Sequence, residues 1–165
     1  IGKRTNLEAF YLLGDFGVKV AGRSCMLTPP VQRLAFGDIC TQGLPFYGAS
    51  ITYKIPVTVS RDCRLNVSVT QFRCPVMSVA LDGRDCGNIA LSPYELTIPN
   101  VSAGEHLLEI TAFGNRINSF GTLHNCNHTE TWIGPNAWRT TGPEWAYEYQ
   151  LHESGILVSP VVTEI

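Results

Sequence analysis

The feature that most constrains this chain is the segment 79–98, which reads VALDGRDCGNIALSPYELTI. The pair Asp82-Gly83 lies between apolar stretches, and glycine accepts the positive φ that two-residue hairpin turns require. Further along, Tyr94, Leu96 and Ile98 alternate with polar residues, which places apolar side chains on one face of a strand. The segment therefore predicts a hairpin inside an all-β sandwich.

Alternation with a period of two recurs along the chain and predicts further strands. It is complete in Ser50–Val59 and recurs in Leu65–Val69, while Val76–Leu81 is a more continuously apolar strand and Leu107–Phe113 is a strand that follows a turn. Near the end of the chain it predicts a strand from Trp145 to Leu151, followed by Ile156–Val158. The residues expected to be mainly buried are Ile51, Tyr53, Ile55, Leu65, Val67, Val79, Leu81, Leu96, Ile110, Tyr147 and Tyr149.

Pro56 falls on the polar face of Ser50–Val59. Because proline cannot donate to a ladder, this strand should lie at a sheet edge or carry a bulge. No window shows the periodicity of a useful amphipathic helix, which favours a sandwich over an α/β arrangement. We predict one domain, residues 1–165, folded as an all-β jelly-roll β-sandwich without a helix longer than about three turns.

Composition excludes several classes of partner. Hydrophobic residues make up 44% of the chain and charged residues 16%, with a net charge of −2, so we expect no nucleic-acid partner. No apolar run approaches the roughly 20 residues of a membrane span, and we expect no membrane partner. The chain begins with Ile1 rather than methionine, which indicates a mature fragment or excised domain. Localisation stays open, with an extracellular or periplasmic site favoured over the cytoplasm.

The six cysteines include no CxxC pair, so neither a zinc ribbon nor a thioredoxin-like site is indicated. A domain of this length does not need covalent staples, and we expect mostly reduced, structural thiols, with disulfides left open for an exported protein. The N-glycosylation pattern is interpreted as ordinary polar strand and turn residues where it occurs, at Asn66-Val67-Ser68, Asn100-Val101-Ser102 and Asn127-His128-Thr129.

Several segments carry a resemblance to known carbohydrate-active proteins. Pro45-Phe46-Tyr47-Gly48 precedes a strand, GEHLLEI occupies 104–110, and NRINSFG occupies 115–121. With the hairpin in 79–98, these segments resemble the galactose-binding-like jelly roll of glycoside hydrolase family two and the similar domains of α-L-rhamnosidases. The matched order of segments covers roughly residues 45–160. Folds host many functions, so the resemblance speaks for the fold more than for a ligand.

The tail Trp132–Trp138, followed by Trp145, resembles the C-terminal β-sandwich of rhamnosidase-like bacterial proteins, which commonly follows a barrel. This resemblance implies a non-catalytic accessory module near the C-terminus of a larger protein, whose partner is the adjacent catalytic domain of the same polypeptide. Residues 1–44 match the jelly roll poorly, and the resemblance makes Leu12–Val18 a strand and linker from a preceding domain. Such modules often bind a structural Ca²⁺, but no acidic calcium loop is present here.

Catalytic and metal sites are not indicated by the sequence. A glycosidase needs two carboxyl groups about 5 to 9.5 Å apart, and the nearest candidates, Glu144 and Glu148, are interpreted as solvated strand residues. The run His124-Asn125-Cys126-Asn127-His128 lacks the fourth ligand and the spacing of structural zinc. We predict no catalytic residue, no metal ligand and no cofactor.

The long stretch from Gly114 to Gly142 lacks clean periodicity and is rich in aromatic, Asn and His residues. Long ordered loops carry function more often than strands do. Because sugars stack on exposed aromatic rings beside polar anchors, the candidate ligand contacts are Trp138, Arg139, Trp132, His124 and Asn125. The sequence thus predicts a carbohydrate partner, with weak glycan binding or support of a catalytic domain as the role. A structural or adhesive module, and an independent glycosidase, are the alternatives.

Overall fold

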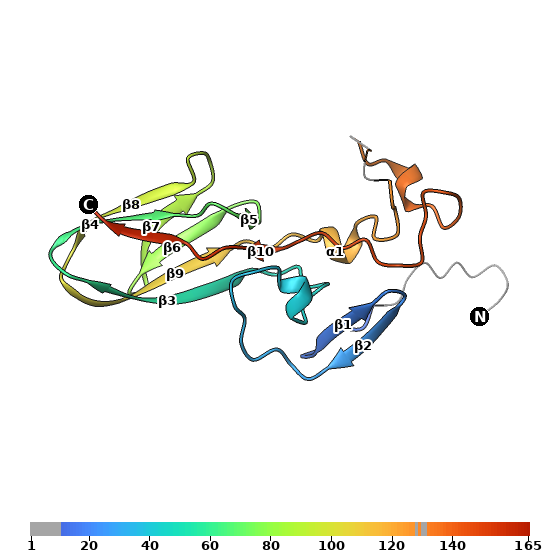
Figure 1. The fold of residues 1–165 in the computed structure, drawn as a ribbon, viewed down its shortest axis with the longest axis horizontal. Coiled ribbons are helices and arrows are strands. Elements are labelled where there is room, and N and C mark those ends of the chain that lie inside the picture. Colours follow the sequence, from blue (N-terminus) through green and yellow to red (C-terminus); the bar gives the residue numbers. More distant parts are fainter. Residues whose placement is uncertain (1–10, 128, 130–131) are drawn as a thin grey trace.

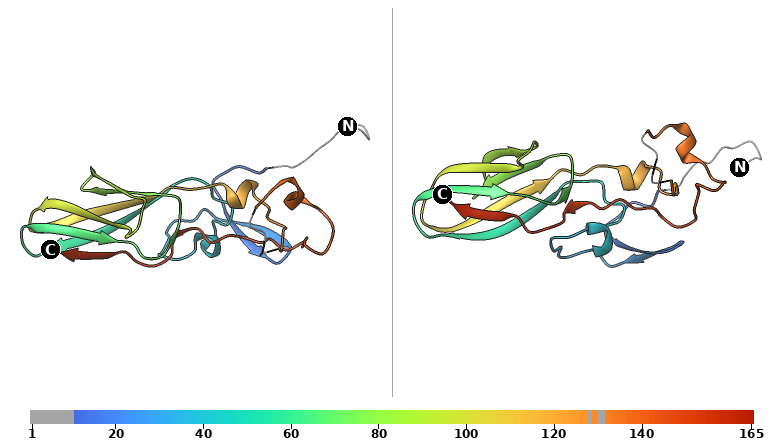
Figure 2. Two further views of the ribbon diagram at one scale, coloured as in Figure 1. Left: turned by 90° about the horizontal axis from the view of Figure 1, so that it is seen from above. Right: turned by 45° about the horizontal axis from the view of Figure 1, so that its top comes forward.

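The computed structural model describes residues 11–127, 129 and 132–165. Most of its strands gather in a β-sandwich at one end of an elongated molecule, and the C-terminus lies at that end (Figure 1, Figure 2). Loops, short helical turns and a separate hairpin occupy the other end. We call the described parts of residues 11–50 and 113–154 the loop region.

Among the described residues, the larger sheet has the order β3-β9-β6-β7 with antiparallel neighbours throughout. Its strands are β3 (Ile51–Val59), β6 (Met77–Leu81), β7 (Arg84–Ile89) and β9 (Gly104–Ala112). Between β6 and β7, Asp82 and Gly83 both have positive φ, 53° and 75°. Positive φ at both central residues defines the hairpin turn that Asp-Gly favours. The predicted hairpin is confirmed.

Pro56 lies in β3, which is an edge strand of the larger sheet. β9 pairs with β3 along its whole length, from Ile51 opposite Ala112 to Val59 opposite Gly104. A proline on an edge strand stands with its nitrogen toward solvent, so it leaves the inner ladder intact. The edge position predicted from Pro56 is therefore confirmed.

The smaller sheet of the described residues has the order β11-β4-β8. It consists of β4 (Cys63–Ser68), β8 (Glu95–Val101) and β11 (Val161–Glu164). A short pair, β5 (Phe72–Arg73) with β10 (Gly155–Ile156), lies beside it toward the loop region (Figure 1). The chain passes between the two sheets at β3 to β4, β7 to β8 and β8 to β9, as in a jelly roll. The predicted all-β sandwich is confirmed.

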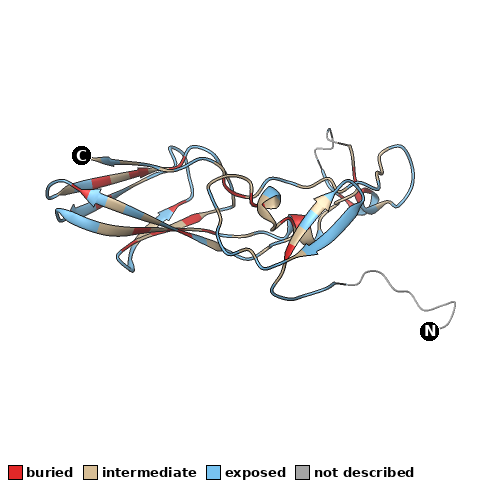
Figure 3. Cartoon of the chain, turned by 60° about the horizontal axis from the view of Figure 1, so that its bottom comes forward, coloured by how far each residue is buried: buried red, intermediate tan, exposed pale blue. Residues whose placement is uncertain are grey.

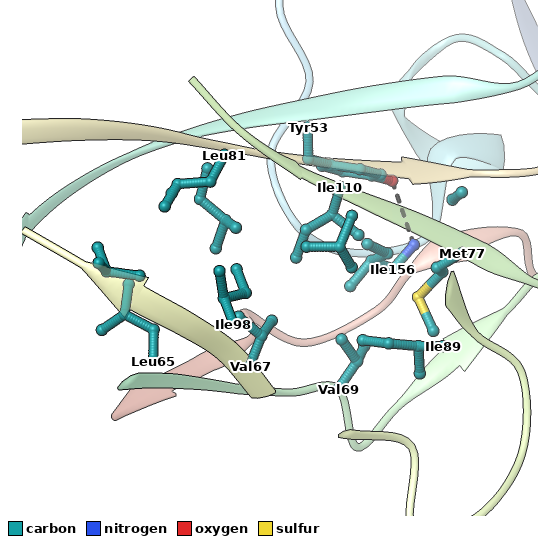
Figure 4. Packing of buried hydrophobic residues seen from close by; sticks show 14 of the residues in the cluster. Tyr53, Leu65, Val67, Val69, Met77, Leu81, Ile89, Ile98, Ile110 and Ile156 are labelled. Carbon is teal, nitrogen blue, oxygen red and sulfur yellow. Dashed lines mark hydrogen bonds between the residues drawn. The ribbon is translucent and has the colours of Figure 1, made fainter. Parts of the chain in front are cut away.

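The core of the sandwich is formed by aliphatic side chains that the two sheets direct toward each other (Figure 4). At one edge of this core, the backbone N–H of Ile156 donates to the Tyr53 hydroxyl at 3.2 Å, which ties β10 to β3. The buried cluster consists of Tyr53, Val59, Leu65, Val67, Val69, Met77, Val79, Leu81, Ile89, Ile98, Val101, Leu108, Ile110, Ala112 and Ile156.

Most of the predicted core residues belong to this cluster, but Ile51, Ile55 and Leu96 are only half-buried. For the two isoleucines the reason is position, because β3 has a neighbour in the sheet on one side only. An edge strand covers its apolar face less completely than a central strand does. Alternation predicted which face is apolar, and the strand order decided how deeply that face is buried.

The loop region contains the hairpin of β1 (Gly17–Ala21) and β2 (Ser24–Thr28), which pairs with no other described strand. Figure 3 shows most of this hairpin as exposed or intermediate. Its helical turns, η1 (Ile39–Gln42), α1 (Ile117–Phe120) and η2 (Pro135–Trp138), have four residues each within the described chain. Residues 11–44 therefore form a hairpin and a turn, and β1 begins only at Gly17, not at Leu12.

The predicted strand from Trp145 to Leu151 is wrong. Instead, this segment lies irregularly beside residues 123–126, with an isolated bridge between Asn125 and Trp145. The N–H of Ala146 donates to the His124 carbonyl at 2.9 Å, and that of Gln150 donates to the Leu123 carbonyl at 2.7 Å. Apolar and polar residues alternate in this segment, but it pairs with no described strand and does not pack against the core of the sandwich. As a result Tyr147, predicted to be buried, is 56% exposed, and Tyr149 is half-buried.

Candidate functional site

The ligand contacts suggested by the sequence all lie in one segment, which we call the aromatic loop (residues 121–150 as far as they are described). The loop is anchored through Asn118 of α1, a buried polar residue. The Asn118 amide donates to the His152 carbonyl at 2.7 Å and accepts from the His152 N–H at 2.9 Å. These bonds fix the chain where it leaves the aromatic loop.

Cys40 and Asp38 extend this anchor to η1. The Cys40 thiol is 3.3 Å from both the Asn118 amide nitrogen and the His152 carbonyl oxygen. Asp38 caps η1 by accepting from the Cys40 N–H, and it also accepts from the Ser154 N–H, both at 3.0 Å. Burial, together with the neighbouring Asp38 carboxylate, raises the pKa of Cys40 to about 12. The thiol is therefore protonated and structural at neutral pH.

His124 and Asn125 form the inner side of the aromatic loop. The His124 ring nitrogen Nδ1 lies 3.0 Å from the Ala146 carbonyl oxygen, and the ring packs 4.8 Å from Tyr149. Asn125 is buried, and its side-chain oxygen accepts from the Asn127 N–H at 3.0 Å. Both side chains are thus engaged with the loop's own backbone and rings.

Arg139 and Glu144 form an ion pair that closes the loop. The Arg139 Nη1 donates to the carboxylate, and its Nε donates to the Asn136 carbonyl at 2.7 Å. The second carboxylate oxygen accepts from the Asn127 amide at 2.9 Å. The sequence suggested Arg139 as a ligand contact but gave no signal for its pairing with Glu144.

Two of the tryptophans of the loop, Trp132 and Trp138, are on its outer side, with exposed fractions of 75% and 54%. Trp138 is the last residue of η2, in which Ala137 is buried and its N–H donates to the Gly134 carbonyl at 2.9 Å. A Cβ at Gly134 would clash with the Trp132 ring, because that ring lies directly against the Gly134 backbone. A sugar-sized ring could therefore approach either indole from solvent.

Beside Trp138 the surface forms an open hollow of about 440 Å³, lined by Pro135, Asn136, Trp138 and Arg139. It combines an aromatic face with amide and guanidinium groups, the composition typical of a sugar contact. A larger open hollow, of about 900 Å³, lies between residues 30–36 and the start of β3. None of the candidate ligand contacts lines this hollow.

A contact that the sequence did not predict joins the β1–β2 hairpin to the aromatic loop. The Arg23 guanidinium lies 3.8 Å from the ring centre of Tyr147, a cation–π geometry. Tyr147 meets Trp145 edge to face at 4.3 Å. Nearby, burial and a hydrogen bond with the Cys25 thiol raise the pKa of Tyr149. The hairpin thus contacts the aromatic loop through the rings of Tyr147 and its neighbours.

The two glutamates considered for catalysis have different surroundings. Glu144 is committed to Arg139, and Glu148 is exposed outside any strand. No group of three His, Cys, Asp or Glu side chains within the described chain could hold a metal ion. His128, part of the run considered for zinc, lies outside the described residues. In the same described portion, the cysteines form no disulfide.

No family model matches the chain, and no curated protein matches its sequence. Among solved structures, it is similar to a rhamnosidase from Novosphingobium sp. PP1Y, with a TM-score of 0.53 and 18% identity, over 98% of this chain and 15% of that chain. A GH2 β-galacturonidase from Eisenbergiella tayi matches in its galacturonate-bound form (TM-score 0.41, 18% identity, 65% of this chain, 18% of that chain). A GH2 β-galacturonidase from the same organism in its glycerol-bound form matches with a TM-score of 0.42 and 19% identity, over 72% of this chain and 21% of that chain.

The rhamnosidase likeness, at this identity, shows a shared fold. This chain corresponds to about one seventh of the length of that enzyme. No helix in the part of this chain that the structure describes is long and apolar enough to cross a membrane.

Proposed function

We propose that this chain is a non-catalytic, carbohydrate-associated accessory module of a glycoside hydrolase, and that Trp138 stands at its glycan-contacting surface. The observation that carries the proposal is the exposed indole of Trp138 at the end of a fixed turn, above a hollow with polar walls. Pyranose rings stack on such faces, and neighbouring donors hold their hydroxyls. The fold shared with part of a rhamnosidase supports the enzyme context.

Within this proposal the suggested residues take different roles. Trp138 and Trp132 offer ring faces, and Arg139 lines the hollow while it holds Glu144. His124 and Asn125 lie on the inner side, so they position the loop from beneath. A shallow platform covers only part of a sugar, so binding is weak, with a Kd in the millimolar range.

Titration with a panel of neutral and acidic oligosaccharides, followed by tryptophan fluorescence and NMR shifts, tests this role. Shifts should centre on residues 135–139, and Trp138→Ala should abolish them. Trp145→Phe is the matched control, because Trp145 is half-buried against His124 and Tyr147. If no sugar at millimolar concentration shifts residues 135–139, Trp138 is not a glycan contact.

A supporting role toward the adjacent catalytic domain of the same polypeptide is the second candidate. It is favoured by apolar side chains that stand in solvent around the hairpin, among them Leu13, Met26 and Leu27. Contact with another domain would remove this apolar surface from water. In a polypeptide that contains both parts, Leu27→Asp should lower the Tm of the catalytic domain. Val161→Asp, at an exposed position of the sandwich, should leave that Tm unchanged.

The absence of catalysis is tested separately. The isolated chain should hydrolyse aryl glycosides no faster than background, since no pair of carboxyl groups with an acid and a nucleophile role is discernible among the described residues. Robust turnover that Glu144→Gln or Glu148→Gln removes would instead make the chain a glycosidase.

A further inference from the structure

Tyr94 has a backbone conformation that is unusual for a bulky residue. Its φ is 57°, in the left-handed region that favours glycine. The conformation is held on both sides, because the Tyr94 N–H donates to the Leu91 carbonyl at 2.8 Å and its carbonyl accepts from the Val69 N–H at 3.1 Å. Strain of this kind persists only where surrounding bonds impose it, and it clusters at ligand sites.

The ring of Tyr94 lies at the seam between the sandwich and the loop region. It meets Phe72 of β5 edge to face, with ring centres 5.0 Å apart and planes at 78°, and it is 37% exposed. An open hollow of about 380 Å³ lies here, lined by Gln71, Phe72, Arg73, Tyr94 and Glu153 among others. Its volume is enough for a single pyranose ring.

The polar groups of this hollow are arranged as a donor beside an acceptor. The Arg73 Nε lies 3.6 Å from a carboxylate oxygen of Glu153, and both side chains are more than half exposed. The Arg73 Nη1 donates to the Phe72 carbonyl at 3.1 Å, which holds the guanidinium near the rings. A guanidinium only donates and a carboxylate only accepts. Two neighbouring hydroxyls of a sugar satisfy both groups at once.

The backbone under these side chains is fixed by the β5–β10 pair. Arg73 stands opposite Gly155 in the register, and the Leu157 N–H donates to the Gln71 carbonyl at 2.9 Å. Glu153 lies two residues before the start of β10. Because Arg73 is carried by paired backbone, it holds its geometry better than a residue of a free loop would, which lowers the entropic cost of binding.

From these observations we infer that the Tyr94 hollow is a second carbohydrate site, separate from Trp138, and that it takes a neutral pyranose with vicinal hydroxyls. The aromatic pair supplies the apolar face, and the Arg73–Glu153 couple bridges the diol. The two charges balance, so the site selects a neutral sugar over a uronate. The inference rests on the proposed function only for its ligand class.

The test titrates the ¹⁵N-labelled chain with methyl α-rhamnopyranoside, methyl β-galactopyranoside and sodium galacturonate. We expect a neutral glycoside to shift the amides of residues 71–73, 94 and 153. Tyr94→Ala and Arg73→Ala should each weaken this binding by about tenfold or more. Arg84→Ala, at an exposed arginine of β7, is the matched control and should change nothing. Trp138→Ala should likewise leave these shifts in place.

The pattern of shifts separates this inference from the proposed function. Shifts at residues 135–139 alone would overturn the second site and keep the Trp138 platform. Shifts at the Tyr94 hollow alone would overturn the Trp138 platform and keep the second site. No shifts with any probe would overturn both, and galacturonate as the only ligand would overturn the diol chemistry.

Stability provides a second readout. Asparagine adopts the left-handed conformation at little cost, so Tyr94→Asn should keep or raise the urea midpoint while sugar binding is lost. A variant that loses stability yet keeps the sugar shifts would show that Tyr94 is structural.

Discussion

The sandwich and the loop region are stabilised by different interactions. The sandwich buries a continuous aliphatic cluster between its two sheets. In the loop region the connections are polar or aromatic: Asn118 bonds to the backbone of His152, Arg139 pairs with Glu144, and Arg23 stacks on Tyr147. Regions with few buried apolar contacts open locally at a lower free energy than a core does. The rings that suit ligand contact thus stand on the less stable part of the molecule.

The largest expected effect concerns the core of the sandwich. Leu65 of β4 is fully buried, so Leu65→Ala should lower the free energy of unfolding by about 2 to 5 kcal/mol. The matched control is Leu13→Ala in the loop region, where the leucine is 89% exposed and the expected change is within about 0.5 kcal/mol. Urea denaturation measures both. Equal losses would mean that the two regions share one core.

A smaller loss is expected from the anchor of the aromatic loop. Asn118→Ala leaves the N–H of His152 without its acceptor and removes one of the two donors to the His152 carbonyl, at a cost of about 1 to 3 kcal/mol. Amide hydrogen exchange should show reduced protection in the loop region and unchanged protection in β4 and β9. Asn118→Asp keeps the acceptor and should lose less. A uniform loss of protection would contradict the separation of the two regions.

The contact between hairpin and aromatic loop should be weaker still. Arg23→Ala removes an exposed cation–π contact worth about 0.5 to 1 kcal/mol. Faster exchange should appear at the amides of β1, β2 and residues 145–149. Arg33→Ala is the control, since Arg33 does not stack on a ring in the described chain. If both variants behave alike, the hairpin is held by something other than Tyr147.

The smallest effect is a pH dependence at the far end of the sandwich. His106 lies 2.6 Å from Asp82 through Nδ1 and 2.9 Å from the Ser102 carbonyl through Nε2. Both partners are acceptors, which suits the imidazolium. The Asp82 carboxylate, with the Ser102 carbonyl, raises the pKa of His106, while bonds from the Leu107 N–H and His106 lower the pKa of Asp82.

The directions of these two pKa shifts define the pH range in which the pair stabilises the fold. The histidine contribution is complete below its ordinary pKa of about 6.5 and is lost as the pH rises through its raised folded value. The aspartate contribution is present above its ordinary pKa of about 3.9 and is lost as the pH falls through its lowered folded value. Urea midpoints of the natural chain and His106→Gln should therefore differ most between about pH 4 and 6.5. A constant difference would contradict the ion pair.

Sequence reasoning succeeded where a local pattern has a direct physical cause. Alternation in Ser50–Val59 exists because one face meets the core and the other meets water, and Asp82-Gly83 has the φ values that its turn requires. Pro56 predicted an edge because a missing N–H is harmless only there. The exposed position of Trp138 agrees with the platform proposed from the sequence, although contact with a sugar stays a prediction.

It failed where structure depends on partners far apart in the chain. Asn118 and His152 are separated by 34 positions, and no periodicity announces their pairing. The alternation in Trp145–Leu151 had no core to face, so it produced no strand. Tyr94 was expected on the inner face of a strand, whereas β8 begins only at Glu95, and a positive φ at tyrosine has no signature in the sequence.

Pro56 also bears on how this protein behaves in a crowded solution. The outer strand of a sheet presents backbone groups that can template the addition of a strand from another molecule, which is the first step of aggregation. In β3 that row of donors is interrupted at Pro56, and the charged Lys54 lies two residues away, paired with Glu109 across the ladder at 3.3 Å. Proline and lysine are the residues with which natural sheets block such growth. The residue that places β3 in the fold therefore also hinders strand addition at this edge of the larger sheet.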